Sequence, residues 1–208
     1  MLNVLRNTWA LFFGFALISI AHGLQGTLVG VRSVLEGFSY TSTGFVIAGY
    51  YVGYLTGSIV IPIFLKRVGH IRVFAAFASI ASIVVLVHSI IINPFSWFVL
   101  RVVSGFSMVC LYTIAESWLN DRASNKNRGQ LLSAYMIVLY TGLAIGMLLL
   151  NLSSPMNYEP FILVSVLLSL ALVPILLTKR SAPKFKKIGT ISVKELYKIS
   201  PLGSVSAF

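Results

Sequence analysis

The sequence predicts an all-α membrane protein with six transmembrane helices, on three observations. Hydrophobic residues make up 57% of the 208 residues and charged residues only 10%, whereas about 25% of a typical soluble domain is charged. Six continuous apolar stretches each approach the roughly 20 residues that a helix needs to cross the hydrocarbon core. Basic residues fall almost entirely into alternate connections. A β-barrel is excluded because its strands are short and alternate in polarity.

The predicted spans are long and their connections are short. Two connections are especially short, Lys66–Arg72 and Asn93-Pro94, so we expect the helices that they join to be antiparallel and packed side by side. Residues 1–178 are predicted to form the bundle, 179–200 a basic cytoplasmic linker, and 201–208 the start of a truncated seventh helix. The six spans are Trp9–Val31, Thr43–Leu65, Ile71–Ile92, Phe95–Trp118, Leu131–Leu152 and Phe161–Leu177.

The distribution of positive charge predicts the orientation. Arg32 lies in one of the other connections and Arg101 lies inside a helix, but the remaining basic residues follow the positive-inside rule. Both termini are therefore expected in the cytoplasm, for a multi-pass protein of the cell inner membrane. The net charge of +11 is a topology signal, so the predicted partner is the lipid bilayer and not nucleic acid.

The residues that carry catalysis or bind metals are few and dispersed. The chain has one cysteine, three histidines and five acidic residues, without an HExxH motif, a paired-carboxylate motif or a phosphate-binding glycine loop. We expect no cofactor, no metal site and no enzymatic activity.

Arg101 is the strongest candidate for a functional residue. An arginine in a spanning helix costs at least about 2.5–3.5 kcal/mol, so it rarely faces lipid. Gln25 lies about as deep and His22 one turn deeper, so the three side chains are expected to meet if the first and fourth helices face each other. The alternative is that Arg101 reaches the outer headgroups.

Further polar residues are expected along this pathway. Tyr112 lies on the same stripe of the fourth helix as Arg101, and Tyr50 and Tyr54 bring hydroxyl groups from the second helix. Additional tyrosines, of which some should line a cavity, are Tyr51, Tyr135 and Tyr140.

Glu116 lies near the inner boundary, where Arg67 or Arg72 is its natural partner. This pair is expected to act as a gate or as a simple structural ion pair. An unpaired Glu116 would instead favour proton coupling.

Small and aromatic residues suggest how the helices pack. Gly49, Gly53 and Gly57 form two GxxxG steps, and Gly142 and Gly146 form another; such faces let helix backbones approach closely, for static packing or for sliding. Trp97 and Tyr40 are expected in the outer interfacial belt and Trp9 and Trp118 in the inner one. His70 is expected to be solvated.

The connection between the second and third spans resembles the cytoplasmic signature of the major facilitator superfamily, G-x-x-x-D-R-x-G-R-R/K. Arg67 and Gly69 match it, whereas Pro62 and Lys66 replace the first glycine and the aspartate. Arg101 and Gly105 are similar to the R-x-x-x-G of the fourth helix in this family. The segments Ala115–Arg122 and Glu36–Ser39 resemble its YcaD-like branch.

This resemblance implies a secondary transporter of which the chain is the N-terminal six-helix half, built as a 3+3 repeat. It implies that the first and fourth helices line a central cavity and that the second and fifth form gates. The cytoplasmic gate would contain Lys66, Arg67, Gly69, Arg72, Glu116 and Asp121. Gly105 would join the glycines that pack the helices.

The predicted function is alternating-access transport of a small solute, which charge complementarity to Arg101 makes anionic or zwitterionic. The missing C-terminal half or a second copy would complete the cavity. The alternatives are a non-transporting scaffold or channel subunit and, with less support, a membrane enzyme. A transporter half should gather its polar groups on one central face, whereas a scaffold need not.

Overall fold

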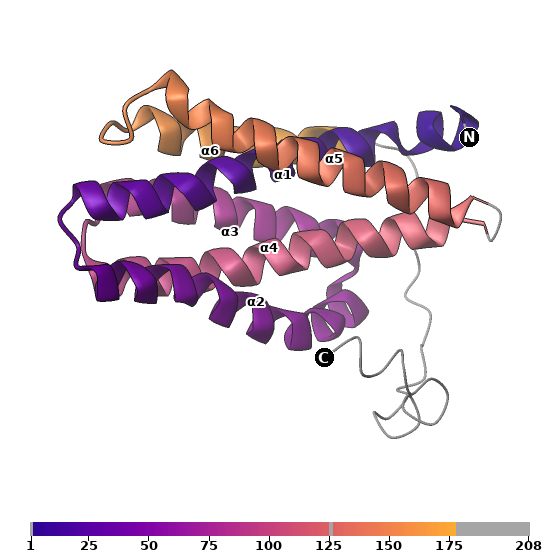
Figure 1. Ribbon diagram of the computed structural model, residues 1–208. Coiled ribbons are helices and arrows are strands. Elements are labelled where there is room, and N and C mark those ends of the chain that lie inside the picture. The colour runs from indigo at the N-terminus through magenta and orange to yellow at the C-terminus, as the bar shows by residue number, and fades with distance from the viewer. Residues whose placement is uncertain (1, 125–126, 178–208) are drawn as a thin grey trace, which may run out of the picture.

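The structure is a bundle of long helices that run roughly along one direction (Figure 1). This computed structural model describes residues 2–124 and 127–177. All six helices are long and apolar enough to cross a membrane, which confirms the predicted helical class and the predicted spans. The predicted linker 179–200 and seventh-helix start 201–208 lie outside the described residues. The elements are α1 (Leu2–Leu35), α2 (Tyr40–Val68), α3 (His70–Ile90), α4 (Pro94–Arg122), α5 (Arg128–Leu149), the short 3-10 helix η1 (Leu150–Leu152) and α6 (Glu159–Leu177).

Local sequence explains where several helices begin. The Ser39 hydroxyl caps α2 by accepting a hydrogen bond from the backbone N–H of Ser42 at 3.1 Å. Asn93 caps α4 in the same way, and Pro94 occupies the first turn, where a missing N–H costs nothing. A single residue, Gly69, separates α2 from α3, and its φ of 87° favours glycine.

The order of helix packing differs from the order of the chain. Adjacent helices follow the sequence α5–α1–α6–α3–α4–α2, and α2 lies mainly against α4. The prediction that a short connection packs α2 beside α3 is therefore wrong, whereas the corresponding prediction for α3 and α4 is confirmed. A tight turn reverses the chain, but it does not decide which faces of the two helices meet.

When α1, α2 and α3 are exchanged with α4, α5 and α6, respectively, the packing order becomes α2–α4–α3–α6–α1–α5. This is the same order read from its other end. This internal symmetry is the 3+3 repeat. Two pairs of helices related by it make the closest backbone approaches, and we call them the α2–α4 seam and the α1–α5 seam. In the α2–α4 seam, Gly53 lies against the Val102 carbonyl and Gly105 against the Tyr50 carbonyl, with no space for a Cβ.

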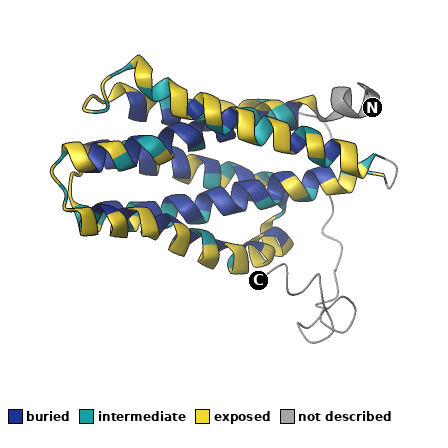
Figure 2. Cartoon of the chain, viewed as in Figure 1, coloured by how far each residue is buried: buried dark blue, intermediate teal, exposed yellow. Residues whose placement is uncertain are grey.

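Buried residues line the inner faces of the helices, and exposed residues lie along the outside (Figure 2). Helices α2 and α5, at the two ends of the packing order, are the least buried. The bundle therefore has a face on which α2 and α5 are open, while α3 and α6 pack against each other elsewhere.

Two tryptophans predicted in the interfacial belts and one histidine predicted to be solvated are buried inside the protein. Trp97 is fully buried and its indole Nε1 donates to the Ile91 carbonyl at 2.7 Å, and Trp118 is buried as well. His70 is buried against α4, where its Nε2 is 3.1 Å from the Ser117 hydroxyl. Residue type indicates an interfacial preference, but not which face of its helix a residue occupies.

Candidate functional site

A cavity of about 340 Å³ lies among the four helices α1, α2, α4 and α5. Its walls combine aromatic rings, one carboxylate and two leucines. Four of the residues predicted for the pathway line it, namely His22, Tyr50, Tyr54 and Tyr112. The remaining lining residues are Tyr51, Glu116, Tyr135, Leu139 and Leu143.

His22 connects three of these helices. Its Nδ1 and the Tyr112 hydroxyl on α4 share a short hydrogen bond of 2.5 Å. Its ring also stacks on Tyr50 of α2, with centroids 5.3 Å apart and planes 24° apart. The imidazole is therefore held from two sides, and its position depends on the packing of α1 against both α2 and α4.

Arg101 lies behind this layer and does not line the cavity. Its guanidinium carbon is 4.6 Å above the centroid of the Tyr50 ring, a cation–π contact. The side chain is 5% exposed, and its Nε and Nη1 have no hydrogen-bond partner among the described residues. The predicted inward position is thus found, but Tyr50 separates the charge from the cavity.

Gln25 is also buried and absent from the lining. Its Nε2 donates to the Ser104 hydroxyl of α4 at 3.2 Å, which joins α1 to α4. Its Oε1 is buried without a partner among the described residues, as is the Tyr50 hydroxyl. Gln25, Tyr50 and Arg101 therefore leave several polar atoms unpaired in the cavity wall and directly behind it.

Glu116 occupies a different place from the predicted one. Its Oε1 accepts a hydrogen bond from the Tyr135 hydroxyl of α5 at 3.0 Å, and no ion pair joins it to Arg67 or Arg72 in the described part of the chain. The expected arginine pairing is therefore wrong. The carboxylate lines the cavity, because Glu116 follows Tyr112 by one helical turn and shares its face.

The other residues of the predicted cytoplasmic gate lie at the end of the bundle that contains the α2–α3 turn. Lys66 and Arg67 form the last turn of α2, and Arg72 is in the first turn of α3. Asp121 is exposed near the end of α4. Lys66, Arg67 and Arg72 flank Gly69, so this part of the sequence motif forms a turn between helix ends and not an extended loop.

The predicted packing glycines lie at helix contacts. Gly49, Gly53 and Gly57 face α4, where Gly105 faces back toward α2. Gly142 and Gly146 face α1, and Gly23 faces back toward α5.

Leu139 and Leu143 are lining residues that the sequence interpretation missed. They follow Tyr135 at intervals of four and eight residues, so one face of α5 carries all three. That spacing is a usable signal, but leucines in an apolar helix do not distinguish a cavity wall from a lipid-facing surface.

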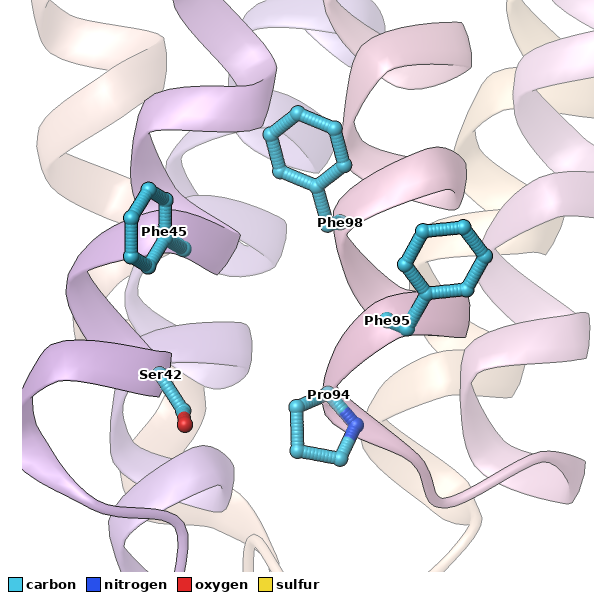
Figure 3. Close-up of a pocket in the computed structure, with 5 residues that line it drawn as sticks. All are labelled: Ser42, Phe45, Pro94, Phe95 and Phe98. Carbon is cyan, nitrogen blue, oxygen red and sulfur yellow. The ribbon is translucent and has the colours of Figure 1, made fainter.

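A second, shallow hollow of about 400 Å³ lies between the first turns of α2 and α4. Figure 3 shows its phenylalanine rings, Phe45 from α2 and Phe95 and Phe98 from α4, around a gap flanked by Ser42 and Pro94. The hollow is apolar apart from Ser42 and lacks the converging polar groups of the first cavity. Among the described residues, no group of three or more metal-ligating side chains comes together in either place.

Comparison with known proteins places this fold in a family. The sequence profile of the Major Facilitator Superfamily matches residues 8–204. The Uncharacterized MFS-type transporter YcaD of Escherichia fergusonii is 28% identical over 196 residues, which are 93% of this chain and 51% of that protein. The YcaD of an Escherichia coli strain is 32% identical over 148 residues, 70% of this chain and 38% of the relative.

A solved structure agrees with this placement. The crystal structure of the nucleoside transporter NupG superposes with a TM-score of 0.75 at 15% identity, over 96% of this chain and 50% of NupG. At this identity the likeness shows the fold alone. The chain spans about half the length of the relatives that it matches. It belongs to the Major Facilitator Superfamily and corresponds in extent to one six-helix half of such a protein.

Proposed function

We propose that this chain is the N-terminal half of a secondary transporter that moves a small solute across the inner membrane by alternating access. The observation that supports this most is the convergence of polar side chains from four helices on one cavity. His22, Tyr54 and Glu116 come from α1, α2 and α4, and Tyr135 comes from α5. A static scaffold needs no such convergence.

The unpaired polar atoms in the cavity wall and behind it favour transport over a scaffold. A buried polar group without a partner costs about 1–3 kcal/mol. Gln25, Tyr50 and Arg101 contribute four such atoms among the described residues. A protein that only needed stable packing would gain by replacing them with apolar groups, so their presence suits a pathway whose groups find partners in another conformation or with a solute.

The helix seams provide the surfaces on which such a conformational change can occur. Transporters of this family alternate by movement of repeats around a central site. Here the glycine faces let the backbones of α2 and α4 approach closely at Gly53 and Gly105. The open face along α2 and α5 is where a C-terminal half, or a second copy of this chain, would complete the cavity.

The gate is proposed at the end of the bundle that contains Lys66, Arg67, Gly69, Arg72 and Asp121, on the cytoplasmic side. Glu116 is reassigned from the gate to the cavity, because it bonds to Tyr135. The charge of Arg101 gives no support for an anionic or zwitterionic solute, because Arg101 does not line the cavity.

Thiol labelling tests whether the cavity is a water-filled pathway. With Cys110→Ser as the background, Tyr54→Cys is compared with Ile59→Cys, which is exposed and lies about 140° around α2 from Tyr54. A membrane-impermeant maleimide should react with Tyr54→Cys at least about tenfold faster, because thiolates form and react only where water reaches them. Equal rates at the two positions would favour a scaffold.

Labelling of loop cysteines tests the proposed orientation. Asn93→Cys should react from outside the cell and Ser124→Cys only after the membrane is permeabilised. Labelling of both positions from the same side would contradict the topology, since α4 separates them.

A further inference from the structure

We propose that the cavity binds an organic cation, with Glu116 as its counter-ion and the rings of Tyr54, Tyr112 and Tyr135 as its walls. This inference rests on the proposed function and names the chemical class of the solute. It replaces the expectation drawn from Arg101, because the charge that reaches the cavity is negative.

The Glu116 carboxylate lies in the wall of the cavity. Glu116 is exposed on the cavity side of α4, and the Tyr135 hydroxyl fixes one of its oxygens at 3.0 Å. A phenol is a neutral donor, so this bond orients the carboxylate without cancelling its charge. Among the residues that line the cavity, Glu116 is the only acidic residue, and none is lysine or arginine.

Some of the tyrosine rings that line the cavity already contact other protein groups. The Tyr50 ring is already engaged, because it stacks with His22 at 5.3 Å and contacts the Arg101 guanidinium at 4.6 Å. Tyr135 has one face covered by Phe15, which stacks at 4.4 Å.

The remaining rings line the same cavity as the acid. Tyr54 is partly exposed there, whereas Tyr112 and Tyr135 contribute small surfaces, because they are only 8% and 1% exposed. Glu116 lies within electrostatic range of the Tyr54 and Tyr135 hydroxyls. Several aromatic rings beside one carboxylate form the arrangement that recognises substituted ammonium groups, because ring faces and the acid both attract positive charge.

The two opposite charges of α4, Arg101 and Glu116, lie far apart along the helix. Arg101 precedes Glu116 by fifteen residues on α4, which is about 22 Å along the helix axis. A cation in the cavity is attracted by Glu116 and kept from the far end by Arg101, whereas an anion meets a carboxylate first and reaches Arg101 only past Tyr50. Leu139 and Leu143 offer apolar contact for the substituents of the cation.

The size of the cavity fits one small molecule. Its volume of about 340 Å³ is within the roughly 300–1,000 Å³ of ligand pockets in proteins.

Two ions of the same shape and opposite charge test this proposal. Equilibrium dialysis of the purified chain in detergent, with protein-free micelles subtracted, should show tetraphenylphosphonium bound at least about tenfold more tightly than tetraphenylborate. Glu116→Gln should weaken tetraphenylphosphonium binding about tenfold and reduce that preference, while Glu116→Asp should retain the preference because it keeps the charge.

The control is Glu159→Gln, which removes an acid that is exposed at the start of α6 and outside the cavity. It should leave both affinities unchanged. Tyr54→Leu should bind tetraphenylphosphonium more weakly, because it removes an aromatic ring that attracts the cation. Reactivity of the buried Cys110 reports whether each variant is folded.

Equal affinities for the two ions, tighter binding of tetraphenylborate, or equal effects of Glu116→Gln and Glu159→Gln would overturn the cation site. None of these results would contradict the transport proposal, which fails separately if Tyr54→Cys is not labelled from water.

Discussion

The α2–α4 seam and the α1–α5 seam have the same backbone geometry and different side chains around it. In the α2–α4 seam, a Cβ added to Gly53 would meet the carbonyl of Val102 and the backbone nitrogen of Phe106. These atoms lie three residues before and one residue after Gly105.

The α1–α5 seam repeats these positions one for one. A Cβ on Gly146 would meet the carbonyl of Ile20 and the backbone nitrogen of Leu24, three residues before and one residue after Gly23. The contacts of Gly23 follow the same rule, because it lies against the carbonyl of Leu143, three residues before Gly146.

This correspondence aligns the two halves of the repeat residue by residue. With Gly23 equivalent to Gly105, the counterpart of Arg101 is Ser19, and the counterpart of Glu116 is Val34. Ser19 satisfies its hydroxyl on its own helix, through the Phe15 carbonyl at 2.9 Å. Both halves therefore hold the same seam, but at these two positions α4 has a buried cation and a cavity acid where α1 has Ser19 and Val34. The packing of the bundle and the proposed binding chemistry reside in different residues.

The largest expected effect tests whether the two seams are equivalent. Gly53→Ala and Gly146→Ala should each destabilise the bundle by about 3 kcal/mol, because the new methyl group meets backbone that cannot move aside. Unfolding in mixed SDS micelles, followed by the reactivity of buried Cys110, measures the change.

Gly26→Ala and Gly44→Ala are the controls, since a Cβ at either position meets nothing within 4 Å. Both should be neutral or stabilising by up to about 1 kcal/mol, the difference in helix propensity between the two residues. A difference above roughly 1 kcal/mol between Gly53→Ala and Gly146→Ala would show that the seams are not equivalent.

The next effect concerns the positions where the seams differ. Arg101→Met should stabilise the bundle by about 1 kcal/mol, because it removes a buried charge with two unpaired nitrogens, a gain larger than the lost contact with Tyr50. Ser19→Ala, at the equivalent position of α1, should change stability by less than about 0.5 kcal/mol. A loss of stability in Arg101→Met would mean that the guanidinium already has a partner in the membrane.

The sequence allowed the helices to be predicted because their cause is local. Each span is an apolar run long enough to cross the bilayer, and this property is readable without knowledge of neighbours. The glycine pattern indicated close packing as well. It did not indicate that Gly53 meets Gly105 and Gly146 meets Gly23, because a small-residue face does not identify its partner helix.

The site was only partly predictable for the same reason. Depth along a helix placed His22, Gln25 and Arg101 in one region, but it could not show that Tyr50 stands between Arg101 and the cavity. The partner of Glu116 was sought among arginines by charge. The structure pairs it with Tyr135, which comes close only because α5 crosses beside α4 at that level.

A smaller effect is expected from loss of the hydrogen bond between Gln25 of α1 and Ser104 of α4. Ser104→Ala should cost about 1 kcal/mol, because it leaves the Gln25 Nε2 unpaired beside an Oε1 that has no partner among the described residues. The matched control is Ser107→Ala on the same helix, whose hydroxyl bonds only to the Val103 carbonyl. Equal costs in the two variants would show that the contact between α1 and α4 adds nothing to stability.

The smallest effect concerns the helix pair that the repeat maps onto itself, α3 and α6. The Ser82 hydroxyl lies 2.7 Å from that of Ser165 and 3.0 Å from that of Ser169, so a polar cluster joins two apolar helices. Interhelical hydrogen bonds in membranes contribute about 0.6 kcal/mol on average, and Ser82→Ala should cost about that much in the same unfolding assay. Ser58→Ala, which removes only a bond within α2, should cost less. If Ser82→Ala proved as costly as Gly53→Ala, polar contacts and not the glycine seams would be the main attachment between the two halves of the repeat.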